Sequence, residues 1–118
     1  MSKPILCLDF DGVCHSYTSG WQGPTVINDP PVDGLAEFLA EAQKEFDIAI
    51  YSSRSCQGGI PAMYEWFKKY TTDSIANKLT FPQEKPPAFI TIDDRALTFT
   101  GVWPSLETLK AFKPWNKR

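Results

Sequence analysis

The sequence predicts one α/β domain over residues 1–118, a three-layer sandwich with a mainly parallel central sheet. Short apolar segments alternate along the chain with segments in which apolar residues recur at helical spacing. The resulting order of strand, helix, strand, helix and strand implies parallel pairing through right-handed crossovers, with helices on both faces. A chain of 118 residues can form a hydrophobic core but leaves no room for a second catalytic domain.

Three short apolar segments are the expected strands. Residues 5–10 (ILCLDF) follow Pro4 and precede Gly12, a pattern typical of a strand buried on both faces. Residues 47–52 (DIAIYS) and 89–94 (FITIDD) have the same character and also end in polar residues. These segments therefore predict a sheet of at least three strands.

Helices are expected between and after these strands. In residues 35–46 the apolar side chains fall on one helical face, and Asp33 is the expected N-cap. The members of that face are Leu35, Phe38, Leu39, Ala42 and Phe46. A second helix is expected over residues 60–70, opened by Pro61, and a last one near residues 105–112. The proline-containing residues 71–87 receive no assignment.

Composition limits the classes of function. Twelve basic and fourteen acidic residues give a net charge of −2, so the whole molecule does not attract nucleic acid or anionic membranes. No apolar run approaches the roughly 20 residues of a membrane span, and the N-terminus lacks the pattern of a signal peptide. Cys7, Cys14 and Cys56 form no CxxC pair, which argues against disulfides or a zinc cluster. We expect a cytoplasmic protein with free thiols.

All three predicted strands end in polar side chains. The carboxyl ends of parallel strands meet at one edge of a sheet, and this edge is where open α/β sheets bind ligands. Taken singly, an Asp-Gly pair is often a turn, an Asp-Asp pair a solvated loop and a Ser-Ser pair a backbone cap. Their coincidence at successive strand ends favours one site. Its members are Asp9 and Asp11, Ser52 and Ser53, and Asp93 and Asp94.

The charge of this edge indicates its ligand. Two carboxylates ~4 Å apart repel by roughly 4 kcal/mol at an effective dielectric near 20, which is large against a protein stability of about 5–15 kcal/mol. A cation or a lysine is therefore required. An all-oxygen ligand set suits Mg²⁺, which is commonly held by one or two carboxylates together with a phosphate. The pattern indicates phosphoryl chemistry.

Three segments also carry a resemblance to a known family. LDFDGV (residues 8–13) resembles motif I of the haloacid dehalogenase-like superfamily, YSSRS (51–55) its motif II, and TIDDRA (91–96) the Asp-Asp form of its motif IV. The Ser-x-Arg and Asp-Asp-Arg forms are most similar to small phage and bacterial members and to the phosphatase domain of polynucleotide kinase-phosphatases. The resemblance implies a Rossmann-like, capless fold and a Mg²⁺-dependent phosphatase that forms an aspartyl-phosphate.

The resemblance implies catalytic roles for the end of the first strand. Asp9 would be the nucleophile. Asp11 would protonate the leaving oxygen and then activate water, a task that needs a pKa raised by the surrounding carboxylates. Gly12 would let backbone N–H groups approach the phosphoryl group, and Ser52 would bind a phosphoryl oxygen.

The resemblance also implies metal and phosphate ligands. Asp94 would bind the metal together with Asp9 and the backbone carbonyl of Asp11, while Asp93 would act through water or as a support. Phosphate binding would involve Gly12, Ser52, Ser53, Arg54 and the motif III lysine, for which Lys85 is preferred over Lys78. Arg54 and Arg95 have two roles open, binding phosphate or pairing with a carboxylate.

The connection after motif I bears on the substrate. Residues 13–32 suffice for a flap but not for a cap domain. Tyr17 and Trp21 on this flap either stack on a base or sugar or anchor the flap. We expect a phosphorylated small molecule or a nucleic-acid end as the partner, with no membrane and no obligate protein partner.

Two other interpretations remain open. A receiver domain of two-component signalling has similar length, carboxylates and Mg²⁺. Its acidic pair lies on the first strand, however, whereas the acidic pair of this chain comes last. A non-catalytic relative that binds metal or phosphate is the other alternative. No GxxxxGK[ST] loop is present, which argues against ATP use through a P-loop.

Overall fold

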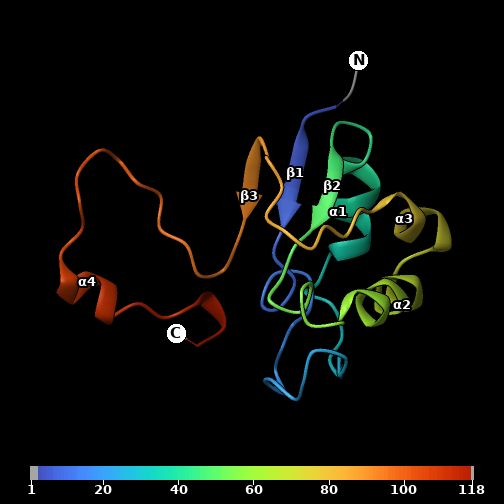
Figure 1. Cartoon of the computed structure of the whole chain (residues 1–118), viewed down its shortest axis with the longest axis horizontal. Helices are drawn as coiled ribbons and strands as arrows, with labels where there is room; N and C mark the ends of the chain where they lie inside the picture. The colour runs from blue at the N-terminus through green and yellow to red at the C-terminus, as the bar shows by residue number, and fades with distance from the viewer. Residues whose placement is uncertain (1–2, 118) are drawn as a thin grey trace.

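Three parallel strands form the sheet of the computed structural model, which describes residues 3–117 (Figure 1). Their order is β2-β1-β3, and Leu6 of the central strand is level with Ile48 on one side and Ile90 on the other. The carboxyl ends therefore lie at one edge, and the predicted parallel α/β arrangement is confirmed. The strands are β1 (Ile5–Leu8), β2 (Asp47–Ile50) and β3 (Ile90–Ile92).

Four α-helices and a final 3₁₀ turn accompany the sheet. Residues 71–87, left unassigned from sequence, contain a short helix whose N-cap Thr72 accepts a hydrogen bond from the N–H of Ile75 at 3.1 Å. The elements are α1 (Leu35–Ala42), α2 (Ile60–Tyr70), α3 (Asp73–Lys78), α4 (Leu106–Lys110) and the 3₁₀ turn Trp115–Lys117. Among the described residues, no helix has the length and apolar character needed to cross a membrane.

The start of α1 differs from the prediction. The N-cap is Gly34, with φ of 89°, and not Asp33. The chain enters the helix through a left-handed residue, a conformation that glycine adopts without the steric penalty of a Cβ. No side chain caps this helix end.

The core joins the strands to the first two helices. Residues Leu6 to Leu8 of β1 and Ile48 to Ile50 of β2 are buried, as expected for strands covered on both faces. Phe10, directly beyond β1, meets Trp66 and Phe67 of α2 edge-on at ring distances of 5.0 and 5.7 Å. This aromatic cluster lies under the carboxyl end of the sheet and supports the loop that carries Asp11.

The last quarter of the chain departs from the predicted sandwich. After β3, residues 93–117 form a C-terminal arm that runs away from the sheet and then turns back toward it (Figure 1). Ile90 and Ile92 of β3 are 53% and 41% exposed, so this strand is not covered as β1 and β2 are. The arm also exposes large apolar side chains, namely Leu97, Phe99, Val102, Trp103, Leu106 and Leu109.

Candidate active site

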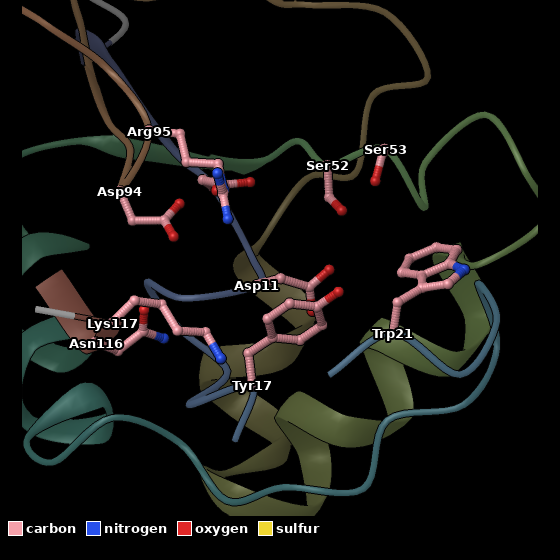
Figure 2. A pocket seen from close by; sticks show the side chains of 10 residues that line it. Asp11, Tyr17, Trp21, Ser52, Ser53, Asp94, Arg95, Asn116 and Lys117 are labelled. Carbon is pink, nitrogen blue, oxygen red and sulfur yellow. The ribbon is translucent and has the colours of Figure 1, made fainter. Parts of the chain in front are cut away.

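A pocket of about 220 Å³ opens at the carboxyl edge of the sheet (Figure 2). Strand ends from all three strands contribute to its lining, because the parallel register brings those ends together. The contributing residues are Asp9, Asp11, Ser52, Ser53 and Asp94. The structure thus brings together most of the side chains that the sequence placed at this edge.

Other parts of the chain complete the pocket wall. Tyr17 and Trp21 come from the flap, and Arg95 follows β3. Asn116 and Lys117 come from the end of the C-terminal arm, which no sequence pattern had connected with the site. The wall therefore combines aromatic and cationic side chains with the carboxylates.

Three carboxylates converge on one side of the pocket. Oxygen atoms of Asp9, Asp93 and Asp94 all lie within 4.8 Å of one another. Burial raises the pKa of Asp9 to about 8, and the hydrogen bond with Asp94 and the charge of Asp93 add to this rise. A cation bound at the cluster would counter this rise. An all-oxygen donor set of three carboxylates fits Mg²⁺.

A glycine makes the approach of Asp94 possible. Gly12 has φ of +83°, and a Cβ at this position would lie 2.2 Å from Oδ2 of Asp94. Any other residue at this position would push Asp94 away from Asp9 or shift the loop itself. The Asp-x-Asp-Gly pattern therefore acts here through packing of the carboxylate cluster against the backbone.

Asp11 has different neighbours from Asp9. Its carboxylate accepts hydrogen bonds from Nε of Arg54, at 3.2 Å to Oδ1 and 3.0 Å to Oδ2, and from Nη2 at 3.0 Å to Oδ1. Nδ1 of His15 lies 2.9 Å from Oδ1. The other ring nitrogen, Nε2, accepts the backbone N–H of Asp29 at 3.1 Å, so the ring proton is on Nδ1 and is donated to Asp11.

These partners overturn the expected ionisation of Asp11. Burial alone would raise its pKa, but the hydrogen bonds from His15 and Arg54, together with the Arg54 charge, lower the pKa below its usual value. The prediction of a raised pKa at Asp11 was wrong, because it considered only the neighbouring carboxylates. Asp9 is the pocket carboxylate whose pKa is raised.

The fully buried Arg54 links Asp11 to the flap through hydrogen bonds. Its side chain has no exposed surface, and Nη1 donates to the carbonyls of Gly23, Pro24 and Val26 at 3.0, 3.1 and 3.0 Å. Nε and Nη2 are engaged with Asp11, and Arg54 does not join the pocket lining. Of the two roles left open for Arg54, the structure therefore has the pairing with a carboxylate.

The flap is fastened to the domain by polar contacts. The buried Asp29 accepts the N–H and Oγ–H of Ser19 at 2.8 and 2.6 Å, while its own carbonyl accepts the indole N–H of Trp66 at 3.0 Å. Tyr17 has φ of 61°, an uncommon conformation for a bulky residue and one often found at functional sites. These contacts and this backbone conformation place the Tyr17 side chain at the pocket.

The remaining predicted residues lie in different surroundings. Oγ of Ser52 accepts the N–H of Arg54 at 3.1 Å, which leaves the hydroxyl proton of Ser52 available for donation to another acceptor. Asp93 accepts the N–H of Arg95 at 2.8 Å and belongs to the carboxylate cluster but not to the pocket lining. Lys85 does not line the pocket either. Lys78, the other candidate, lies in a hollow with Lys3 and Gln43.

Sequence reasoning missed two parts of this site. His15 is the single histidine of the chain and follows Asp11 by four residues, a signal that was present but was not used. Lys117 carries no local signal, because its position depends on how the C-terminal arm returns to the domain.

Comparison of the chain with protein-family models, with curated proteins and with solved structures finds no match.

Proposed function

We propose that this protein is a Mg²⁺-dependent phosphatase that hydrolyses phosphomonoesters through an aspartyl-phosphate on Asp9. One observation carries the proposal. The carboxyl edge of the sheet combines a cluster of three carboxylates with a separate carboxylate, Asp11, whose ionised form is held by Arg54 and His15. Environments that push the pKa values of two neighbouring carboxylates apart are a recurrent feature of sites that divide nucleophilic and proton-transfer roles.

The metal would be held by Asp9 and Asp94, with Asp93 as a further ligand or support. When bound, Mg²⁺ supplies positive charge to the phosphoryl oxygens and lowers the pKa of the carboxylates around it. This charge is needed because Asp9 must be ionised in order to attack phosphorus. The resemblance of motifs I and IV to the haloacid dehalogenase-like superfamily supports the same ligand set.

In the first step, a carboxylate oxygen of Asp9 forms a bond to phosphorus, and the bond between phosphorus and the leaving oxygen breaks. The leaving oxygen takes a proton from Asp11. In the second step, Asp11 accepts a proton from water as the water oxygen attacks phosphorus and releases Asp9. The lowered pKa of Asp11 favours its role as base in the second step. For the first step Asp11 must take a proton from solvent beforehand, because the neutral His15 ring carries a single proton, on Nδ1, and would become an imidazolate by giving it up.

The open pocket supports a proposal for the substrate class. Trp21 is 46% exposed and Tyr17 lies beside Asp11, so both offer rings at the mouth of the pocket (Figure 2). Aromatic rings of this kind stack on bases and sugars. Together with the likeness of Ser52-Ser53-Arg54 and Asp93-Asp94-Arg95 to polynucleotide phosphatases, this favours a nucleotide or nucleic-acid end phosphate.

The test compares kcat/KM for a 3′-phosphorylated oligonucleotide, the matching mononucleotide and a small sugar phosphate. We expect both nucleotide substrates to exceed the sugar phosphate, with little gain from chain length because the net charge is −2. A sugar phosphate that wins by about tenfold, or ~1.4 kcal/mol, would replace this substrate class with a metabolite phosphate.

A further inference from the structure

Residues near the C-terminus form one wall of the pocket. Asn116 and Lys117 belong to its lining, although they lie about a hundred residues from the motif I carboxylates. Figure 2 shows the Lys117 side chain extending toward Tyr17 and Asp11, across the pocket from Ser52 and Ser53. The last turn of the C-terminal arm is thus part of the site.

One hydrogen bond joins this turn to the domain, and a second closes the turn itself. The indole N–H of Trp115 donates to the carbonyl of Gly12 at 2.7 Å. Pro114 is the single buried residue of the C-terminal arm, and its carbonyl accepts the N–H of Lys117 at 3.0 Å. Most of the arm is exposed, so the hydrogen bond from Trp115 to Gly12 is what places Lys117 next to the loop that carries Asp11.

The charges in the pocket call for a cation at this position. A phosphomonoester brings about two negative charges at neutral pH, and the lining already contains Asp9, Asp11 and Asp94. Among the ten lining residues, the cationic side chains are Arg95 and Lys117. Arg54 is committed to Asp11 and the flap, as described above.

The Lys117 ammonium is free to take a ligand. Within residues 3–117 it makes no hydrogen bond or ion pair, and its side chain is exposed at the pocket. We propose that Lys117, positioned by the hydrogen bond from Trp115 to Gly12, binds the phosphate group of the substrate. This inference rests on the proposed phosphatase function and assigns to the C-terminal end a charge that sequence reasoning placed at Lys85.

The test uses inorganic phosphate as the probe, in the full-length protein with Mg²⁺ at low salt. We expect Lys117→Gln to weaken phosphate binding by about tenfold, near the lower end of what a hydrogen bond to a charged group contributes. Lys117→Arg should restore binding because it keeps the charge. Lys110→Gln removes the same charge from α4 of the same arm and should leave binding unchanged.

A second variant tests the anchor. Trp115→Phe keeps an aromatic ring but removes the N–H that reaches Gly12, so it should weaken phosphate binding in the same direction while Lys117 remains present. KM for a phosphomonoester should rise in parallel with the phosphate Kd in both variants. Urea unfolding of each variant should match wild type, which separates loss of binding from loss of fold.

The outcomes distinguish the two proposals. Equal phosphate Kd values for Lys117→Gln and Lys110→Gln would overturn the role of Lys117, whether or not the protein is a phosphatase. Lys117-dependent phosphate binding without hydrolysis of any phosphomonoester would uphold this role and refute the proposed catalysis. A wild-type protein that neither binds phosphate nor hydrolyses phosphomonoesters would refute both.

Discussion

Replacing Asp94 with Asn should stabilise the metal-free protein at alkaline pH. The pKa of Asp9 is raised from 3.8 to about 8, first by burial and then by its carboxylate neighbours. A raised pKa in the folded state means that proton binding stabilises the fold. This stabilisation is complete below about pH 4 and is lost as the pH rises through about 8.

The magnitude follows from that pKa. Each pKa unit corresponds to about 1.4 kcal/mol, so the full rise corresponds to about 6 kcal/mol before any discount for solvent screening at the half-buried Asp9. Burial is the largest cause and is unaffected by the substitution. We assign about 1–2 kcal/mol to Asp94, because Asn removes its charge and offers an N–H to Asp9. The gain should appear at pH 8.5 and shrink at pH 5.

Urea unfolding with excess chelator, at pH 5 and at pH 8.5, measures this gain. Added Mg²⁺ should then stabilise the wild type by mass action and stabilise Asp94→Asn far less. Glu45→Gln, which removes an exposed carboxylate elsewhere, is the matched control and should behave as wild type. The role assigned to Asp94 is refuted if Asp94→Asn is less stable than wild type at pH 8.5 without metal, or if it gains as much stability from Mg²⁺ as wild type does.

Three further substitutions probe the site. Asp11→Asn should lose most activity with alkyl phosphates and least with an activated aryl phosphate, and equal losses would contradict its role in proton transfer. Arg54→Met should lower the free energy of unfolding by about 3–5 kcal/mol, because a buried ion pair is broken and three flap carbonyls lose their donor. A loss under about 1 kcal/mol, measured by urea unfolding, would refute the structural role of Arg54 between Asp11 and the flap. Gly12→Ala should abolish Mg²⁺ stabilisation, whereas Gly101→Ala, also at positive φ but with no atom within 4 Å, should retain it. Equal Mg²⁺ stabilisation in the two variants would contradict the packing of Gly12 against Asp94.

The sequence predicted those helix and strand bounds that are marked by neighbouring residues. The bounds of α2 and the starts of β1 and β2 agree with the sequence, because apolar periodicity and flanking residues mark them. The exposure of β3 was not predictable. Its apolar sequence resembles that of β1, and only the path of the C-terminal arm decides whether such a strand is covered.

The candidate site likewise has residues that the sequence predicts and contacts that it does not. Asp9, Ser52 and Asp94 share a pocket because strand polarity and register alone bring their ends together. The ionisation of Asp11 could not be predicted, because its partner Arg54 lies 43 residues away and was one of several arginines with open roles. The position of Lys117 likewise depends on a contact between residues 103 apart, which no spacing in the sequence encodes.

Phosphate release under multiple turnover is the decisive test of Mg²⁺-dependent hydrolysis through Asp9. An aryl phosphate is supplied to wild type and to Asp9→Asn, with Mg²⁺ or with excess chelator, and inorganic phosphate is counted per protein molecule. We predict many phosphates per wild-type molecule with Mg²⁺, and none with chelator or in Asp9→Asn. A single phosphate retained on a stable phosphoprotein, undiminished release in chelator, or near-normal release by Asp9→Asn would contradict this prediction.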